Sequence, residues 1–453
     1  MKSILYLSLI IPLLFPAQDM ILDHGGGEYY THQGECLTTA QRAAIEEDIE
    51  LQKRSLEELG LLEQSDRSSI IEFSLPIQGS EELDWNNIYG ISNYVDQVSG
   101  GDIGDYNCGQ RTYNGHLGTD YFTWPFGHYL KENDLAEVVA AAPGTIIQKL
   151  DGMFDEQCDL NATLTWNAVY ISHADGSVAW YGHLKEGSLT TKAIGETVEQ
   201  GEYLGIVASS GFSSGPHLHF EIHDVDNNII DPYTGSCNSL NTETWWLDQD
   251  TYTRMELNTH LTHDEIPEHG CPSEFENPHF QSYFNNSDIV YLVPYFKDQD
   301  PSTVVTYTVL NPFGTLYTTW EHSSDQYYNS SWWYWTLQMP LLGGEGTWTF
   351  RIQFDGQTYD RLFFLGDPPV GLQTAELPSF SIGPNPAFDI LTISGGEDIL
   401  SYRITDISGR LQMSDEISPN DYFELEIGHL AKGIYHMELL SNSGSTVKEF
   451  IKY

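Results

Sequence analysis

Most of the chain after Pro76 consists of short apolar runs, rich in β-branched and aromatic residues, that Gly, Asp and Asn separate. Runs of about four to eight residues bounded by such turn formers are typical of strands in antiparallel sheets. The clearest examples in the first part of this region are 138–142, 145–149, 168–172, 178–182 and 218–222. This pattern predicts a mainly β protein.

One segment before this region has helical spacing. Between residues 38 and 62, apolar residues recur at helical intervals among Glu, Gln, Lys and Arg. Gly60 is a suitable end for the helix, but its start is not fixed, because Thr39 is followed three residues later by Arg42, which cannot complete a capping box. We expect residues 18–85 to form a helical propeptide or spacer.

A chain of 453 residues is too long for one hydrophobic core and predicts roughly two to four folded units. The expected parts, in order, are a β domain at 86–240, a connector at 241–271 with some helix at 244–249, an immunoglobulin-like β-sandwich at 272–366, a linker at 367–378, and a last β-sandwich at 379–453. The expected strands of the middle sandwich are 290–295, 303–309, 314–320, 331–337 and 346–354.

The expected strand at 331–337 is unusually aromatic. It places Trp332 and Tyr334 on one face, and Trp333 and Trp335 on the other. One face must fill the core of the sandwich. The other is either covered by a second sheet, loop or domain, or forms an aromatic platform for a glycan or peptide.

Residues 1–17 have the outline of a secretory signal peptide. Lys2 precedes a twelve-residue run from 4 to 15 that only Ser8 interrupts, and Ala17 is a small residue at the expected cleavage point. The run is well short of the ~20 residues that cross a bilayer, and no later stretch is long and apolar enough to do so. We therefore expect an exported protein with no stable membrane span.

Cysteines of an exported chain are expected to pair. The chain has five, and we predict disulfides between Cys108 and Cys158 and between Cys237 and Cys271, as nearest neighbours in sequence. Cys36 is then left over, just before the helical segment.

The charge balance excludes some classes of partner. With 19 Lys and Arg against 66 Asp and Glu, the formal net charge is −47. So few cations cannot neutralise a phosphate backbone, which excludes a general nucleic-acid binder. Anionic membrane surfaces are disfavoured for the same reason.

Histidines gather in three segments of the first β domain. On a strand, residues two apart share a face, so His217 and His219 can enter one site together. His116 and Asp120 can meet one ion where a turn leads into a strand. Two imidazoles and one carboxylate leave a coordination position for water, as catalytic zinc requires. The three segments are 115–120, 180–187 and 213–223.

These segments resemble the motifs of the lysostaphin/LytM type of zinc metalloendopeptidase, peptidase family M23. The resemblance covers about residues 89–231 and implies an antiparallel β peptidase fold. The matching stretches are the HxxxD of His116 and Asp120, the His-Leu-His of 217–219, the Tyr-Gly-His-Leu of 181–184, and supporting residues at 138–146, 195–211 and 213–222.

Carried over residue by residue, the resemblance implies that His116, Asp120 and His219 bind one Zn²⁺ per chain. His183 and His217 then flank the open position. Either imidazole would accept a proton from the zinc-activated water, and the imidazolium would stabilise the oxyanion or protonate the leaving amine. Which of the two performs which step stays open.

The implied activity is hydrolysis of peptide bonds in peptidoglycan cross-links or in Gly-rich protein segments. An alternative from another class is a non-catalytic surface module that binds cell wall or extracellular matrix. Three further histidines, His128, His173 and His223, are expected to be structural.

The last block resembles the C-terminal sorting domain of type IX secretion substrates in Gram-negative bacteria. The matching stretches are 383–393, 402–411, 427–439 and 447–453. The resemblance implies the type IX secretion machinery as a partner, and a secreted protein or one on the outer cell surface. The alternative is a third sandwich domain of no special role.

By the same family analogy, the N-terminal helix is a candidate latency segment. Cys36 would then cap the zinc as a removable thiolate. The alternative is an unpaired or intermolecular thiol.

Overall fold

The computed structural model describes residues 22–23, 36–62, 71–158, 165–270, 276–338, 343–366, 381–383, 387–394, 399–406, 411–416, 422–441 and 444–452. The chain divides into two compact units, residues 1–363 and 364–453, which are described separately. The described residues are mainly β, as the sequence predicts, with two helices, α1 (Thr39–Glu58) and α2 (Gly127–Glu132). The expected signal peptide lies outside them.

The capping box of α1 lies one residue before the pair Thr39 and Arg42 that was considered in the sequence. Thr38 is the N-cap: its Oγ1 accepts from the Gln41 N–H at 3.2 Å, and the Gln41 side chain accepts from the Thr38 N–H at 2.9 Å. This reciprocal pair is a complete capping box. Gly60, with φ of +68°, follows the last turn, as expected.

The central sheet of the first unit has eight strands. Its order is β3-β4-β11-β8-β7-β6-β9, with β12 paired to β11, and every pairing is antiparallel. The strands are β3 (Tyr89–Asn93), β4 (Thr119–Thr123), β6 (Gly144–Leu150), β7 (Ala168–Ser172), β8 (Val178–Gly182), β9 (Thr197–Val198), β11 (His217–His223) and β12 (Ile229–Ile230). Four of the five expected runs are strands here.

The fifth run overlaps β5 (Ala136–Val139), which joins a small three-stranded sheet with β2 (Ile77–Gly79) and β10 (Tyr203–Ile206). Leu218, Phe220 and Ile222 of β11 enter the core on the side of this small sheet. The alternate residues of β11 therefore face the opposite side of the central sheet.

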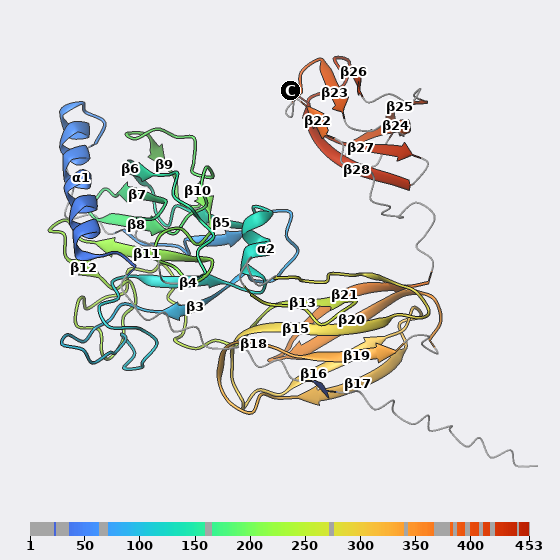
Figure 1. Cartoon of the computed structure of the whole chain (residues 1–453), viewed down its shortest axis with the longest axis horizontal. Coiled ribbons are helices and arrows are strands. Elements are labelled where there is room, and N and C mark those ends of the chain that lie inside the picture. The colour runs from blue at the N-terminus through green and yellow to red at the C-terminus, as the bar shows by residue number, and fades with distance from the viewer. Residues whose placement is uncertain are drawn as a thin grey trace, which may run out of the picture. The chain divides into compact units, whose positions relative to one another are not determined.

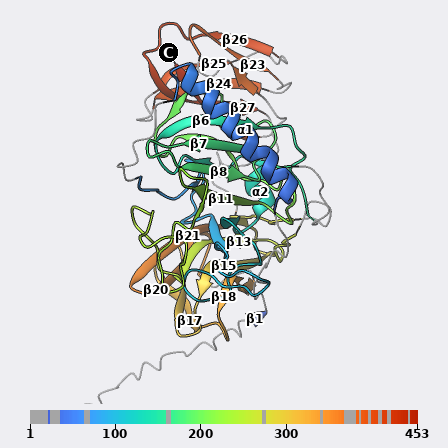
Figure 2. The same cartoon turned by 90° about the vertical axis from the view of Figure 1, so that its left-hand side faces the viewer.

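That opposite side is covered by α1. Ile45, Ile49 and Leu56 of the helix are buried in one cluster with side chains of β6, β7 and β8, among them Tyr170 and Trp180. Figure 2 shows α1 crossing in front of these strands. The helix is amphipathic because one of its faces has to complete the core of the sheet.

The middle block is a sandwich of two five-stranded sheets. Tyr307 and Trp335 pack against each other between the sheets, with their ring centroids 4.5 Å apart. The first sheet has the order β1-β19-β15-β13, with β18 paired to β15, and the second has the order β14-β21-β20-β16-β17. The strands are β1 (Leu22–Asp23), β13 (Glu256–His263), β14 (Tyr283–Phe284), β15 (Ile289–Gln299), β16 (Val305–Leu310), β17 (Leu316–His322), β18 (Tyr328–Trp332), β19 (Tyr334–Gln338), β20 (Gly346–Phe354) and β21 (Gln357–Leu365). Figure 1 shows both sheets.

Two expectations for this region are wrong. There is no helix at 244–249, where Trp246 instead forms a β-bridge with Phe73. The expected connector at 241–271 contains β13, the strand at one edge of the first sheet, which pairs with β15 at seven positions. The strand expected at 331–337 is also divided, because the chain leaves the ladder at Trp333 between β18 and β19.

The aromatic residues of this stretch are covered. Trp333 and Trp335 are each 3% exposed, and Tyr334 is 6% exposed. Trp332 packs on His269, with ring centroids 5.0 Å apart. The arrangement matches the structural alternative rather than an open platform.

The predicted disulfides are wrong, because Cys108 bonds to Cys237, 129 residues away in sequence. The Cys237 N–H donates to the Tyr106 carbonyl at 2.8 Å, so the two loops lie side by side. Cys158 is disulfide-bonded as well, whereas Cys271 lies outside the described residues. Cys36 is a free, buried thiol.

The second unit is a β-sandwich, as expected for the last block. One sheet has the order β22-β23-β26 and the other β25-β24-β27-β28, around a core that includes Leu391, Ile404 and Phe450. The strands are β22 (Ser381–Gly383), β23 (Ile390–Ser394), β24 (Ile399–Asp406), β25 (Leu411–Glu416), β26 (Tyr422–Glu426), β27 (Gly433–Ser441) and β28 (Gly444–Lys452). Among the described residues of the whole chain, neither helix could cross a membrane.

Candidate metal centre

Three of the residues that the sequence singles out converge at one point. The β4–β11 register sets His219 directly opposite Asp120, and His116 lies in the turn that leads into β4. His116 Nε2 is 3.1 Å from Asp120 Oδ1 and 3.3 Å from His219 Nδ1. His219 Nδ1 is 2.9 Å from Asp120 Oδ1. All three side chains are 1% exposed.

Neighbouring groups fix which ring nitrogen faces this point. His116 Nδ1 is 2.8 Å from the Tyr94 carbonyl, which can only accept, so Nδ1 carries the proton and Nε2 keeps its lone pair. His219 Nε2 is 2.9 Å from a Glu221 carboxylate oxygen, which leaves the lone pair on Nδ1. Such partners orient metal ligands and set their tautomers.

The third donor is oriented in the same way, because Asn93 Nδ2 donates to Asp120 Oδ2 at 3.0 Å. Burial alone would raise the pKa of Asp120, but the neighbouring His116 and His219 hold it well below the usual value. Two lone pairs and a carboxylate oxygen therefore lie about 3 Å apart, an arrangement that is stable only with a cation or proton between them.

The backbone at Gly118 lies close to β11. A Cβ added to Gly118 would lie 2.7 Å from both His219 Nε2 and the Phe220 carbonyl oxygen. Glycine is therefore the residue that allows the turn after His116 to pass over β11.

His183 and His217 lie beside the three donors, with their ring centroids 4.3 Å apart. His183 follows β8 with φ of +65°, a backbone conformation that is costly for a residue other than glycine and that is frequent at functional sites. Its Nδ1 lies 2.6 Å from the Ser210 carbonyl, and His217 Nδ1 lies 2.9 Å from the Gly215 carbonyl. Both rings therefore present Nε2 as the acceptor in their neutral form.

The protonation of His183 follows from its surroundings. Burial, and then the charge of His217, lower its pKa to about 4. At pH 7 its ring is neutral and can accept a proton. His217 Nε2 is 3.9 Å from Asp120 Oδ1, so the pair borders the donor cluster.

Glu221 and Arg42 belong to the site, although the sequence analysis did not assign them. Glu221 is fully buried and its second oxygen is 2.6 Å from His223 Nε2. Arg42 of α1 forms a two-point ion pair with the same carboxylate. Burial would raise the pKa of Glu221, but Arg42, His219 and His223 hold it well below the usual value. The alternation of β11 was the signal, since it puts Glu221 on the face of His217 and His219.

The remaining histidines have structural partners, as expected. His173 Nδ1 is 2.8 Å from the Pro143 carbonyl, and burial lowers the pKa of its ring. His223 stacks on Trp180, with ring centroids 4.6 Å apart. Burial, and then Lys131, lower the pKa of His128 to about 4.

Cys36 also reaches the donor cluster. Its Sγ is 3.0 Å from Tyr113 Oη and 3.8 Å from His219 Nδ1, and its side chain is 5% exposed. Burial would raise the pKa of this thiol, but the neighbouring His219 holds it well below the usual value. A buried thiol in this place does not fit the alternative of an intermolecular disulfide.

Two groups of side chains in the described part of the chain could hold a metal ion. One is Cys36 with His116, Asp120 and His219, and the other is Cys36 with His183 and His217. Within each group the ligand atoms all lie within 4.8 Å of one another. All five residues that the sequence predicts for the site are therefore brought together, and Cys36 is common to both groups.

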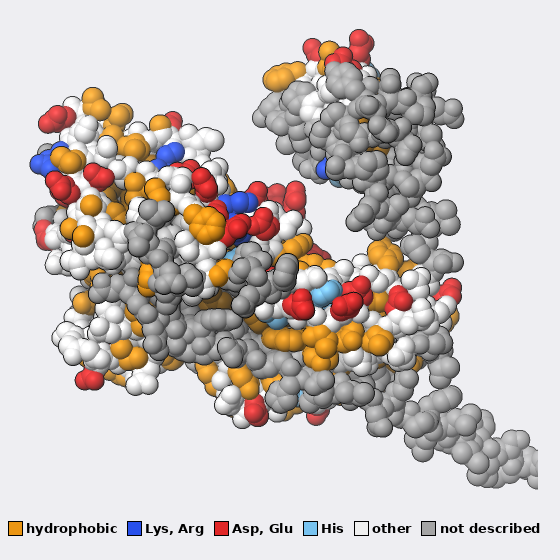
Figure 3. Space-filling view, in the orientation of Figure 1, with side chains coloured by type: hydrophobic (Ala, Val, Ile, Leu, Met, Phe, Trp, Pro, Cys, Tyr) orange, Lys and Arg blue, Asp and Glu red, His pale blue; other side chains and the backbone are white. Residues whose placement is uncertain are grey.

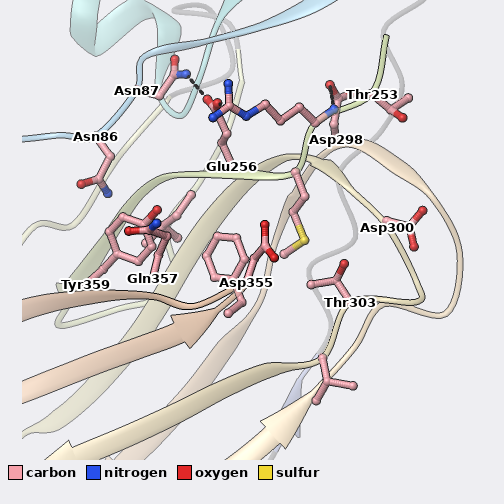
Figure 4. A pocket seen from close by; sticks show the side chains of 15 residues that line it. Asn86, Asn87, Thr253, Glu256, Asp298, Asp300, Thr303, Asp355, Gln357 and Tyr359 are labelled. Atoms are coloured by element: carbon pink, nitrogen blue, oxygen red, sulfur yellow. Dashed lines mark hydrogen bonds and ion pairs between the residues drawn. The ribbon is translucent and has the colours of Figure 1, made fainter. Parts of the chain in front are cut away.

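A separate cavity of about 740 Å³ lies where residues 86–87 meet the sandwich (Figure 4). Its carboxylates are partly neutralised, because Glu256 binds Lys297 at 2.9 Å and accepts a hydrogen bond from Asn87 at 2.7 Å. None of the site residues predicted from the sequence lines it, and no group that could hold a metal lies there among the described residues.

We expect the buried charge of Glu221 to set the metal affinity of the site. A Glu221→Gln variant keeps the shape and an acceptor for His219 Nε2 but leaves Arg42 without its anion. Loss of such a partner of a metal ligand typically weakens binding about 10- to 100-fold, which competition with a chelator for zinc would measure. Glu199→Gln, an exposed change of the same charge, is the control and should leave the affinity unchanged. Equal affinities in the two variants would contradict a role for Glu221.

Curated relatives resemble only part of the chain. The DD-carboxypeptidase/endopeptidase Mpg of Neisseria meningitidis serogroup B is 49% identical over 55 residues, which is 12% of this chain and 12% of that protein. The peptidoglycan DD-endopeptidase ShyC of Vibrio cholerae is 31% identical over 106 residues, 23% of this chain and 19% of that protein. The chain thus spans less than a fifth of the length of either relative.

Two solved structures each match about a third of the chain. The catalytic domain of lysostaphin from Staphylococcus simulans is 21% identical, with 34% of this chain and 96% of that chain covered and a TM-score of 0.20. A zinc-containing peptidase from Vibrio cholerae is 23% identical, with 32% of this chain and 39% of that chain covered and a TM-score of 0.20.

Family models match two regions. The model of peptidase family M23 matches residues 126–232, which include His183, His217 and His219. His116 and Asp120 precede this match and join the site through the β4–β11 pairing. The model of the secretion system C-terminal sorting domain matches residues 381–453. The chain therefore contains a peptidase family M23 domain and, after it, a type IX secretion C-terminal sorting domain.

Proposed function

We propose that this protein is a secreted zinc metalloendopeptidase that hydrolyses peptide bonds in peptidoglycan cross-links or Gly-rich protein segments. One observation carries the proposal: the donors of His116 and Asp120 converge in a buried site with His219 of the M23 match, and His183 and His217 of that match lie beside them. This set combines a metal site that has an open position with two candidate proton carriers.

The donor set fits zinc. Ligand atoms about 2.1 Å from a tetrahedral zinc lie about 3.4 Å apart, and the three separations here are 2.9, 3.1 and 3.3 Å. Two neutral imidazoles and a carboxylate are ligands that zinc accepts in catalytic sites, where a fourth position stays available. The hydrogen bonds of Tyr94, Asn93 and Glu221 already hold the donors in this arrangement.

Zinc bound here would act as a Lewis acid and bring the pKa of a bound water toward ~7. The residues of the chain supply the proton transfers. His183 is neutral at pH 7 and offers Nε2 as the acceptor, while its Nδ1–H stays on the Ser210 carbonyl. The resulting imidazolium can pass the proton to the leaving amine. His217, 4.3 Å away, is positioned to stabilise the developing oxyanion.

Two features guide the choice of substrate. The similarity to an endopeptidase of peptidoglycan favours cross-linking peptides. The net charge of −47 disfavours tight docking on strongly anionic wall polymers. On the face drawn in Figure 3, the coloured acidic side chains outnumber the basic ones. We therefore favour neutral or cationic peptide segments as the substrates in which bonds are hydrolysed.

The sorting domain supports a location outside the outer membrane of a Gram-negative bacterium, with the protein either released or attached at the cell surface. The type IX secretion machinery is then the partner of residues 381–453 during export. Cleavage of the signal peptide would precede this step.

The test combines metal analysis with mass spectrometry of released peptides. Wild type, Cys36→Ser and His116→Ala are purified in full length and analysed for zinc, and each is incubated with peptidoglycan and with a Gly-rich fibrous protein. We expect one zinc per chain in the first two proteins, and peptides released by at least one of them but not by His116→Ala. Equal zinc in wild type and His116→Ala would overturn the metal site. Zinc without hydrolysis of either substrate would instead support the non-catalytic surface module.

A further inference from the structure

Cys36 is held where a fourth ligand of the metal would be. Its Sγ lies within 4.8 Å of the ligand atoms of His116, Asp120 and His219 together. For a tetrahedral zinc with Zn–S of about 2.3 Å and Zn–N of about 2.1 Å, the sulfur and nitrogen lie about 3.6 Å apart. The distance from Cys36 Sγ to His219 Nδ1 is 3.8 Å.

The same sulfur faces the two accessory histidines. Sγ lies within 4.8 Å of a ring nitrogen of His183 and one of His217. His183 is fully buried, and its Nε2 has no hydrogen-bond partner among the described residues. An acceptor without a partner next to the donor cluster marks a place for a group that donates a hydrogen bond, such as a water. Cys36 occupies this place.

We propose that Cys36 is the fourth zinc ligand of the full chain and that it keeps the peptidase latent. This inference rests on the proposed function, because it assigns an additional ligand to the same zinc. A site with three His/Asp ligands and one cysteine is closed, as structural zinc sites are, whereas the peptidase reaction needs the fourth position.

The segment that supplies Cys36 is fastened to the sheet at several points. Leu37 is 3% exposed, and Ile45 and Ile49 of α1 are 6% and 5% exposed in the cluster with β6, β7 and β8. Arg42 pairs with Glu221, the partner of His219, and lies 5.3 Å from the ring centre of Trp180. The cysteine is thus positioned by packing and charge together.

This segment also fills the cleft above the site. The space that remains is a cavity of about 200 Å³, bordered by Cys36, Leu37, Arg42, Tyr113 and His116 among others. Ligand sites usually measure about 300–1,000 Å³, so the space left beside Cys36 is smaller than a usual binding site while α1 is in place. Separation of residues 36–62 from the sheet would open the cleft and free the fourth position in one step.

X-ray absorption at the zinc edge of the full chain tests the ligand directly. We expect one sulfur at about 2.3 Å in wild type and only nitrogen and oxygen neighbours near 2.0–2.1 Å in Cys36→Ser. Peptide release by Cys36→Ser should exceed that of wild type at least roughly tenfold, a shift of about 1.4 kcal/mol in the closed-to-open equilibrium.

A second pair of variants tests how the cysteine is held. Ile49→Asp puts a charge under α1, whereas Leu51→Asp puts the same charge on a side chain that is 50% exposed. We expect the first to lose the sulfur neighbour and gain activity, and the second to behave as wild type. Zinc with no sulfur neighbour in wild type would overturn the latent ligand and leave the proposed function standing. Absence of zinc from wild type and Cys36→Ser alike would overturn the proposed function itself.

Discussion

A His183→Ala variant is expected to retain its zinc and to hydrolyse peptide substrate about 10²- to 10⁴-fold more slowly than its parent, the usual contribution of one positioned proton acceptor. The reason is that burial lowers the pKa of His183 to about 4 and the Ser210 carbonyl holds its Nδ1–H, so Nε2 is a neutral acceptor at pH 7. Both proteins should carry Cys36→Ser, so that the fourth position is free. The measurements are kcat/KM and the zinc content.

His173→Ala is the matched control for this experiment. His173 is also buried and its Nδ1 also meets a backbone carbonyl, but it belongs to neither group that could hold a metal. Its removal should leave kcat/KM within a few-fold. If His183→Ala loses zinc as well as activity, His183 is a ligand rather than a proton acceptor. If it keeps full activity, the acceptor is His217 alone.

Two local rules predicted the two halves of the donor cluster, and the family resemblance implied that they form one site. Alternation along a strand places His217 and His219 on one face, and a turn brings His116 to Asp120. The pairing of β4 with β11 then joins the two motifs. Both rules act over a few residues, which is the range in which a sequence pattern determines geometry.

Contacts over longer separations could not be predicted in this way. Arg42 and Glu221 are 179 residues apart, and Cys108 and Cys237 are 129 residues apart. Nothing in the sequence near any of these residues names its partner, and proximity along the chain was a wrong guide for the cysteines. The helix itself was predicted because its amphipathic spacing is local, but the sheet face that it covers was not.

The strand β13 shows why the connector was misjudged. Its sequence, Glu-Leu-Asn-Thr-His-Leu-Thr-His, has only two apolar residues to mark a strand whose side chains are mostly buried. Two of these buried polar side chains each have one backbone partner: Asn258 Nδ2 donates to the Tyr89 carbonyl at 2.9 Å, and His260 Nε2 lies 3.1 Å from the Phe350 carbonyl. Partners of this kind remove the cost of burying a polar group, and they come from distant strands.

Replacement of a metal ligand, unlike replacement of His183, should weaken the binding of zinc itself. We expect His219→Ala to weaken zinc binding about 10²- to 10³-fold, since four-ligand zinc sites bind with about 10–16 kcal/mol, or roughly 3–4 kcal/mol for each ligand. Activity in the Cys36→Ser background should fall at least as far, because His219 supplies Nδ1 to the cluster and also couples it to Glu221. The measurements are zinc affinity by chelator competition and peptide release.

His223→Ala is the comparison that separates ligand loss from loss of packing. His223 lies on the same face of β11, bonds to the same Glu221 carboxylate at 2.6 Å and is 2% exposed, but none of its atoms belongs to the donor cluster. Its removal takes away the stack on Trp180 and one hydrogen bond, so the melting temperature should fall while zinc remains bound. In His219→Ala, Glu221 keeps Arg42 and His223 as partners, so the fold should survive the loss of the metal. Equal zinc affinity in the two variants would show that His219 is not a ligand.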